Sequence, residues 1–173
     1  WQVATAKRLG FEACGDLRLG ICNGESAAET ADIGLERFIV SSEARKSPAA
    51  VIPRGQIIYG ALPVMTLEKC AIREICGAKL PPISACRYCD THRFSYLCDR
   101  LGVKFPMARE YKHRNVIFNS VPVYMGDKKS GMDCEFYHYI FTNESCAEID
   151  RIIGITEKGK NYGGKFCRLS SPK

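Results

Sequence analysis

Short apolar stretches separated by polar turns run along the chain, and their spacing predicts a series of β-strands. In DLRLGIC (16–22), the side chains of Leu17, Leu19 and Ile21 alternate with other residues, as in a half-buried strand. The aromatic stretch EFYHYIF (135–141) has a composition typical of strands. The same criteria predict five strands in all, at 16–22, 37–41, 56–61, 115–119 and 135–141.

Helices are predicted between the first three strands and after the last one. Residues 25–33 fit a short helix that ends at Gly34, and residues 42–46 begin a helical turn. Ser145 and Glu148 form a capping box, in which each side chain bonds a free backbone N–H of the other residue. Apolar positions at helical spacing follow this cap, so the sequence predicts a final helix there.

Strands separated by short helices favour parallel pairing through crossover connections, and hence an α/β fold. A closed (β/α) TIM-like barrel needs eight strands and about 250 residues, whereas this chain has 173 residues. Its first residues already read as an amphipathic helix. We therefore predict a single domain over 1–173, the C-terminal half of a (β/α) barrel whose N-terminal half is missing. Its exposed strand edges predict self-association.

The segment 63–114 does not continue this alternation of strands and helices, and we interpret it as a cysteine-rich insertion within the domain. It holds five of the ten cysteines of the chain, together with several prolines. Two stretches with strand character, 94–99 and 104–108, flank Leu101 and Gly102. This arrangement predicts a β-hairpin that turns near Gly102.

The composition indicates a protein with a hydrophobic core, located in a reducing compartment. With 46% hydrophobic residues, the chain can form a substantial core. It has no apolar run of about eighteen residues and no signal-peptide pattern at its start, so we expect neither a membrane span nor secretion. Disulfide-rich secreted domains are usually smaller, so ten cysteines in a chain of this size favour free or metal-bound thiols in a reducing, cytoplasmic setting.

The strongest local signal for chemistry is a group of four cysteines with the spacing C-x5-C-x9-C-x2-C. A C-x2-C pair places two thiolates on one tight turn, and two further cysteines can complete a tetrahedral set. Thiolates bind zinc or an iron–sulfur cluster, and spacing does not separate these cofactors. Four unrelated thiols, or a disulfide, are the alternative interpretation. The candidate ligands are Cys70, Cys76, Cys86 and Cys89, and the nearby His92 or His113 could replace one of them.

Basic and aromatic residues gather downstream of these cysteines. Residues 1–60 are neutral, with seven Lys/Arg and seven Asp/Glu, so the whole net charge of +6 lies after residue 60. Five cations between residues 100 and 114 are interleaved with Phe105, Tyr111 and His113. Such a pattern is typical of RNA recognition, because phosphates need positive charge and splayed bases need flat partners. A hairpin with a solvated polar face explains the same pattern, and both interpretations stay open.

A set of short motifs follows in fixed order along the chain. They are YGALPVMT (59–66), Cys70, C-x2-C at 86–89, LCDRLGVKFP (97–106), NSVPVY (119–124) and Asp127. Upstream, ICN and VSSE close two of the predicted strands. Together these motifs resemble the collagenase-like peptidases of unassigned catalytic type (peptidase class U, family thirty-two), and the match covers residues 10–145.

The resemblance implies a barrel fold and a cysteine-bound iron–sulfur cluster (4Fe-4S), as in the members that hydroxylate RNA bases or a quinone precursor. It transfers Cys70, Cys86 and Cys89 as cluster ligands. Related short members have a further cysteine where this chain has His113, so His113 and Cys76 compete as the fourth ligand. The family offers no agreed protease residues to transfer.

Three functions are compatible with these features. The first is iron–sulfur-assisted hydroxylation of an RNA base or a small aromatic molecule, with the centre at the mouth of the barrel. The second is peptide hydrolysis, although the chain has neither the H-E-x-x-H nor the G-x-S-x-G motif. The third is a non-catalytic, zinc-stabilised module that binds RNA or protein. For the first function, the substrate-binding residues predicted at the mouth are Asp99, Arg100, Asn119 and Ser120.

Overall fold

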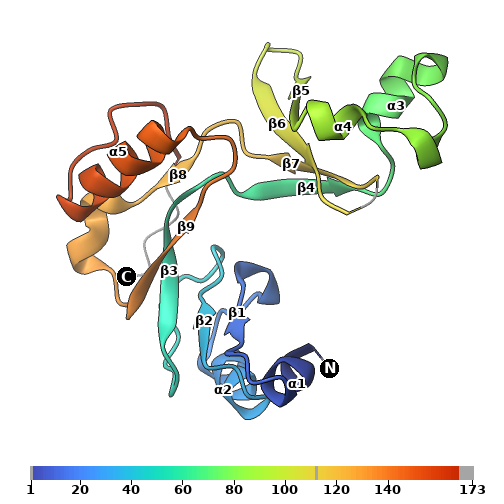
Figure 1. The fold of residues 1–173 in the computed structure, drawn as a ribbon. Coiled ribbons are helices and arrows are strands. Elements are labelled where there is room, and N and C mark those ends of the chain that lie inside the picture. The colour runs from blue at the N-terminus through green and yellow to red at the C-terminus, as the bar shows by residue number, and fades with distance from the viewer. Residues whose placement is uncertain (1, 112, 168–173) are drawn as a thin grey trace. The chain divides into compact units, whose positions relative to one another are not determined.

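The computed structural model describes residues 2–111 and 113–167, and it shows a mixed α/β protein (Figure 1). The chain divides into two compact units. The first unit combines residues 1–60 with 123–173, and the second unit is the segment 61–122 between them. Each unit has a β-sheet of its own.

The first unit is built on a five-stranded mixed sheet. Its strands are β1 (Cys14–Gly15), β2 (Arg37–Ile39), β3 (Arg54–Gly60), β8 (Val123–Tyr124) and β9 (Phe136–Ile140). Strands β1, β2, β3 and β9 are parallel and adjacent in that order, and β8 pairs antiparallel with β3. The helices are α1 (Gln2–Arg8), α2 (Gly24–Asp32) and α5 (Cys146–Glu157), with 3₁₀ turns at Leu17–Leu19 and Gly126–Gly131.

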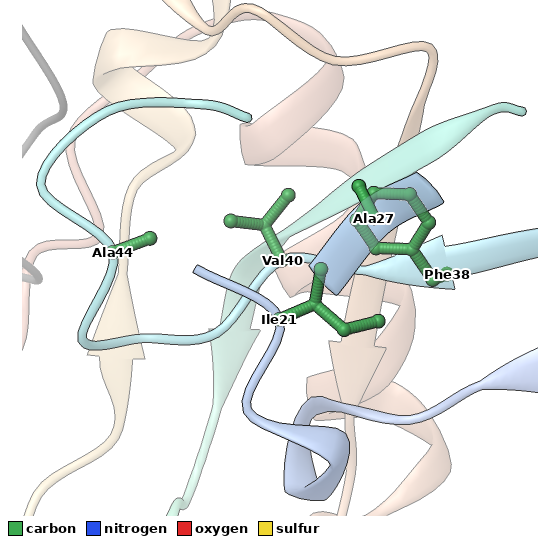
Figure 2. Packing of buried hydrophobic residues seen from close by; sticks show 5 residues of the cluster. All are labelled: Ile21, Ala27, Phe38, Val40 and Ala44. Atoms are coloured by element: carbon green, nitrogen blue, oxygen red, sulfur yellow. The ribbon is translucent and has the colours of Figure 1, made fainter. Parts of the chain in front are cut away.

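One apolar cluster of the first unit joins α2 to β2. Its buried members are Ile21, Ala27, Phe38, Val40 and Ala44 (Figure 2). Phe38 is the largest of these side chains, and Ala27 is small enough for α2 to approach closely. The helix begins with a capping box between Asn23 and Ser26, so its start is defined by local hydrogen bonds as well as by packing.

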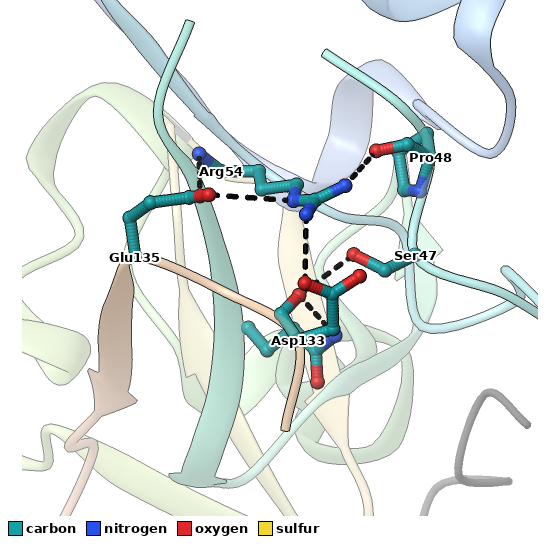
Figure 3. Close-up of polar contacts among 6 residues, drawn as sticks. Ser47, Pro48, Arg54, Asp133 and Glu135 are labelled. Carbon is teal, nitrogen blue, oxygen red and sulfur yellow. Dashed lines mark hydrogen bonds and ion pairs between the residues drawn. The ribbon is translucent and has the colours of Figure 1, made fainter. Parts of the chain in front are cut away.

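Arg54, at the start of β3, ties this strand to the segment that leads into β9 (Figure 3). Its guanidinium donates to Asp133 Oδ1 at 2.7 Å and to the Pro48 carbonyl, and its Nε lies 3.6 Å from Glu135 Oε1. The backbone N–H of Arg54 donates to Glu135 Oε2 at 2.8 Å. Because the Arg54 side chain is only 16% exposed, these partners offset the cost of burying its charge.

Two of the predicted helices are confirmed. The Ser145 hydroxyl accepts the Glu148 N–H at 3.3 Å, and the Glu148 carboxylate accepts the Ser145 N–H at 2.8 Å, as the capping box requires. Helix α5 follows this cap and buries Ile152 and Thr156. The helix predicted at 25–33 is α2.

The second unit is built on a four-stranded sheet that is antiparallel throughout, and it contains the whole segment 63–114. Its elements are β4 (Pro63–Leu67), α3 (Ala71–Cys76), α4 (Tyr88–Thr91), β5 (Phe94–Cys98), β6 (Lys104–Arg109) and β7 (Asn115–Phe118). Short 3₁₀ turns lie at Gly77–Lys79 and Ile83–Ala85. The strand order is β4, β7, β6, β5. Ile72 of α3 packs on Met107 and Ile117 of the sheet, which forms the core of this unit.

The predicted hairpin is confirmed as β5 and β6, which pair antiparallel. Gly102 lies in the connecting turn with φ of 77°, a conformation that favours glycine. The Asp99 carboxylate closes the turn by accepting the N–H groups of Leu101 and Val103 at 2.8 and 2.9 Å.

The strand predicted at 16–22 is wrong. Asp16 instead accepts the Leu17 N–H and caps a 3₁₀ turn. Leu19 is 55% exposed, so only Ile21 of the three alternating residues is buried. The alternation reflects this turn, and the sheet strand β1 lies just before it.

Two further predictions about the sheet are also wrong. No helix separates β2 from β3, because the described residues 40–53 form a loop with turns. The strand predicted at 115–119 is present as β7, but it lies in the second sheet and is antiparallel to both neighbours. Within the described residues no closed barrel is formed, so the sequence prediction holds at the level of the α/β class.

The state of the cysteines and the length of the helices are relevant to the environment of the protein. All ten cysteines lie within the described residues, and all are free thiols. None of the helices that the structure describes is long and apolar enough to traverse a bilayer. The longest of them, α5, has 12 residues, whereas a membrane span needs about 20.

Candidate metal centre

Four of the predicted metal ligands line one small cavity of the second unit, namely Cys70, Cys86, Cys89 and His113. The other residues of its lining are Arg73, Arg109 and Asn115. The cavity has a volume of about 10 Å³, the space of a single water-sized sphere. The lining therefore includes three cysteines, one histidine and two arginines.

Cys70 reaches the cavity from the N-cap of α3. Its backbone is extended, and its carbonyl accepts the N–H groups of Arg73 and Glu74 at 3.1 and 3.2 Å. An N-cap residue stands outside the helix, so its side chain is free to point away from the helical face. The helix start thus sets the position of the first thiol.

The C-x2-C pair brings two thiols to the same wall. The 3₁₀ turn over Ile83–Ala85 ends at Cys86, whose N–H donates to the Ile83 carbonyl at 3.3 Å. Helix α4 begins two residues later and carries Cys89 in its only turn. This tight succession of turns places Cys86 and Cys89 at one cavity, as the spacing predicts.

His113 lies in the connection between β6 and β7. The Arg114 N–H donates to the Tyr111 carbonyl at 3.0 Å, and the Glu110 N–H donates to the Arg114 carbonyl at 3.1 Å. These two bonds close the turn and present the half-buried His113 to the cavity. Antiparallel pairing of β6 with β7 thus brings a residue far from the C-x2-C pair in sequence into the same wall.

The electrostatics of Cys89 follow from its burial and from these neighbours. Burial raises the pKa of the Cys89 thiol, and negative charge on Cys70 and Cys86 raises it further. Arg109 acts in the opposite direction and lowers this pKa. Without a cation in the cavity, the protonated thiol is therefore favoured, because adjacent thiolates repel one another.

Two other candidate ligands lie elsewhere. Cys76 is one helical turn beyond Ile72 on α3, and like Cys70 and Cys89 it packs against the apolar core of the second unit. The His92 ring stacks on Tyr88 with centroids 4.3 Å apart, and its Nδ1 lies 3.2 Å from the Tyr88 carbonyl oxygen. Neither residue is part of the cavity lining.

The donor set fits a soft metal, although the donors are not gathered around one point. Across residues 2–111 and 113–167, no three Cys, His, Asp or Glu side chains are arranged closely enough to hold a metal ion. Ligand atoms lie about 2.0–2.3 Å from zinc, so the side chains would have to turn inward to bind one. Three thiols with one imidazole are nevertheless the donor types that zinc and iron–sulfur sites use.

The predicted substrate-binding residues are not part of this cavity. Asp99 accepts two N–H groups in the hairpin turn, and Arg100 follows it there. The Asn119 N–H donates to the Leu62 carbonyl at 2.9 Å, and Ser120 is half-buried beside it in sequence. The structure therefore brings together the metal ligands predicted from the motifs, but not these four residues with them.

Three lining residues were missed as site residues by sequence reasoning. Arg73 had no distinguishing pattern, and Arg109 was grouped with the RNA-binding cations. Asn115 had a readable signal, because a polar residue in the apolar strand NVIF is unexpected, and its side chain is 1% exposed. A buried polar group usually has a specific partner, and here the Asn115 side-chain oxygen accepts the Ala71 N–H at 2.8 Å.

The positive charge of the protein is concentrated in the second unit. This unit has ten Lys/Arg against five Asp/Glu, a net charge of +5, whereas the first unit has fifteen against fourteen. Tyr96 and Tyr111 of the second unit are 53% and 61% exposed. Lys112, one of the predicted RNA-binding cations, lies outside the described residues. Positive charge beside exposed rings remains compatible with an RNA ligand.

Comparison of the chain with protein-family models, curated proteins and solved structures finds no match. The resemblance to the collagenase-like peptidases therefore stays a prediction from the motifs.

Proposed function

We propose that Cys70, Cys86, Cys89 and His113 hold a metal centre, and that the protein is an iron–sulfur enzyme that hydroxylates an RNA base or a small aromatic molecule. The observation that carries the proposal is that three cysteines and one histidine line the same cavity. His113 lines the cavity and Cys76 does not, so His113 is the better fourth ligand. Cysteine thiolates, with histidine in place of some of them, are established ligands of such clusters.

The residues of the chain have separate tasks in this proposal. The three thiols and His113 bind the cluster, and Arg109 offsets the negative charge of the thiolates at the same cavity. A bound iron–sulfur cluster would supply one-electron transfer. In the net reaction, an oxygen atom passes from an external donor into a C–H bond of the substrate, and the donor leaves reduced by two electrons.

The charge of the second unit supports an anionic substrate. A net charge of +5 over residues 61–122 attracts polyanions and raises their local concentration at this surface. RNA is polyanionic and presents aromatic bases, so it fits both the charge and the exposed rings of this unit.

Peptide hydrolysis is the alternative implied by the resemblance. A cysteine peptidase needs a thiol that is ionised near neutral pH, usually by a neighbouring base or cation. Burial and the neighbouring thiols instead raise the pKa of Cys89. This argues against Cys89 as the nucleophile of such a peptidase.

A zinc-stabilised RNA- or protein-binding module is the second candidate function. The observation in its favour is the volume of the cavity, about 10 Å³, which matches a single ion more closely than a multi-iron cluster. Zinc held by three cysteines and one histidine is a common structural site in small domains. A module of this kind catalyses no oxidation. Its function would be to bind a partner, such as RNA, through the positively charged surface of the second unit.

For the first unit, we propose that the four adjacent parallel strands belong to a TIM-like barrel. Strands β1, β2, β3 and β9 follow the chain order, which is the strand order of (β/α) barrels. Self-association, or a further part of the protein, would supply the other strands. A reducing compartment such as the cytoplasm fits ten free thiols.

Anaerobic purification followed by iron, sulfide and zinc analysis tests the proposal. We expect a brown protein with iron and sulfide, and a hydroxylated product detected as a mass increase of one oxygen atom in RNA or in a small aromatic compound. Cys89→Ser should abolish loading of the cluster. Cys76→Ser is the matched control and should load normally, because Cys76 lies outside the cavity lining.

Two outcomes would contradict the proposal. Equal metal content in the Cys89→Ser and Cys76→Ser proteins would exclude the cavity as the site. A colourless protein with one equivalent of zinc would exclude the iron–sulfur enzyme and support the zinc-stabilised module.

A further inference from the structure

Helices α3 and α4 bring Cys70 and Cys89 to the cavity. In each case the residue that follows the cysteine is bonded to a residue of the sheet. Ala71 directly follows Cys70, and its N–H donates to Asn115 Oδ1 at 2.8 Å. Because Asn115 is 1% exposed, its side-chain oxygen is shielded from bulk water, and the Ala71 N–H is its hydrogen-bond partner. This bond holds the start of α3, and with it Cys70, against β7.

On the α4 side of the cavity, the tie is an ion pair. Asp90 directly follows Cys89, and its Oδ1 lies 2.7 Å from Arg109 Nη2. The two side chains are 39% and 38% exposed, so the pair is partly shielded from solvent. Arg109 also lines the cavity, so its guanidinium faces the thiols as well as Asp90. The ion pair holds α4, and with it Cys89, against β6.

The two tying residues are neighbours in the sheet. Arg109 on β6 and Asn115 on β7 are register partners in an antiparallel pair, and such partners lie about 4.5–5.5 Å apart. The helices that they hold are short, with six residues in α3 and four in α4, and helices of this length are not stable by themselves. The strand pair therefore sets the separation of the two thiol-bearing segments.

We propose that Asn115 and Arg109 are positioning residues, which hold Cys70 and Cys89 at the cavity before a metal ion binds. This role depends on the proposed metal centre and adds the side chains that preorganise it. A metal ion that binds between segments already held in place does not have to offset the entropy of ordering both of them. The other residues of β7, such as Val116, are apolar. The hydrogen bond to Ala71 explains why this strand also contains an asparagine.

The test is a Co²⁺ titration of the reduced protein in the absence of oxygen. Co²⁺ bound by thiolates has charge-transfer absorbance, so the spectrum reports coordination, and competition with a chelator gives the affinity. Arg109→Gln removes the ion pair at a partly exposed position and should weaken Co²⁺ binding by roughly 10- to 100-fold. Arg109→Lys keeps a cation opposite Asp90 and should recover most of this loss.

A second variant and a matched control complete the design. Asn115→Ala removes the acceptor of the Ala71 N–H, so it should weaken Co²⁺ binding and increase hydrogen exchange at the Ala71 amide. Arg37→Gln breaks an ion pair of the same kind in the first unit, where Arg37 Nη2 lies 2.5 Å from Glu12 Oε2. This control should leave the Co²⁺ affinity unchanged.

The outcomes separate the positioning role from the metal centre. Equal Co²⁺ affinity of the Arg109→Gln and unsubstituted proteins would overturn the positioning role and leave the metal centre in place. An equal loss in Arg37→Gln, or no recovery in Arg109→Lys, would also overturn it. If the unsubstituted protein shows no thiolate–cobalt absorbance, the metal centre itself is refuted. Because Arg109 is partly exposed, these results stand even if Asn115→Ala does not fold.

Discussion

Replacing Tyr59 by phenylalanine should lower the free energy of unfolding by about 1.5–3 kcal/mol at neutral pH, the usual contribution of a hydrogen bond to a charged group. The Tyr59 side chain is 1% exposed, and its hydroxyl donates to Glu144 Oε1 at 2.8 Å. The ring is retained in the variant, so its packing against Phe141 and Tyr162, with centroids 5.5 and 5.8 Å away, is kept. The expected loss therefore comes from the hydroxyl group.

The pH dependence of this loss separates the hydrogen bond from a packing effect. Burial raises the pKa of Tyr59, and hydrogen bonds with Tyr162 and Glu144 raise it further. The unfolded chain releases the phenolic proton above about pH 10, whereas the folded protein retains it. The stabilisation by Tyr59 is therefore fully present below pH 10 and declines above it by about 1.4 kcal/mol per pH unit. Phenylalanine has no proton to release, so the difference between the two proteins should shrink above pH 10.

Urea unfolding of both proteins, followed by circular dichroism between about pH 7 and pH 11, measures the difference. Tyr96→Phe is the matched control, because Tyr96 is 53% exposed, and a change of at most about 0.5 kcal/mol is expected there. A loss as small as this control in Tyr59→Phe at pH 7 would refute the assigned hydrogen bond. A loss that stays constant up to pH 11 would refute the link to the phenolic proton.

Three further changes have defined outcomes. Ser145→Ala removes the cap of α5 and should cost about 1 kcal/mol in urea unfolding, whereas Ser145→Asp should restore most of it. Gly55→Ala would place a Cβ atom 2.2 Å from the Phe136 ring, and thermal unfolding should show a loss of about 1–3 kcal/mol from overpacking. Chelation of the metal from loaded protein should increase protease cleavage within 77–85, because this segment joins two ligand-bearing segments; mass spectrometry of the fragments locates the cuts.

The elements that could be predicted from the sequence are those with local signals. Ser145 and Glu148 bond each other across one helical turn, so three residues of spacing contain the whole cap. Gly102 can adopt a positive φ, and strand-forming residues lie on both sides of it, so the hairpin is also encoded within a short segment. In both cases the partner of each group is a near neighbour in the chain.

Strand direction and strand pairing depend on distant residues, and the sequence pattern carries little of this information. The residues of β7 have the apolar character of a strand, but their alternation is the same in parallel and antiparallel sheets. The alternation at 16–22 also fits a 3₁₀ turn, and the burial that would distinguish the two structures is set by tertiary packing.

The same distinction applies to the cavity. Cys86 and Cys89 are brought together by a single short helix, so their proximity follows from spacing. His113 joins them through the pairing of β6 with β7, which required knowledge of the sheet. Cys76 had favourable spacing in the sequence, yet it lies one helical turn after Ile72 on α3 and is not part of the cavity lining. Spacing alone could therefore not decide between these two candidates.

The small core of the second unit gives a physical reason for a metal centre at this place. Of the 19 buried apolar residues among the described side chains, 14 belong to the first unit and five to the second. A segment of 62 residues with so few buried side chains buries little apolar surface, so its stability without further support is marginal. Small domains of this kind are commonly stabilised by disulfides or by a metal, and the cysteines of this unit are free thiols. A metal ion held between α3, α4 and the β6–β7 turn would join three segments that are otherwise linked by a few hydrogen bonds and ion pairs. Its binding energy would then contribute directly to the folding of the unit, whichever reaction the centre supports.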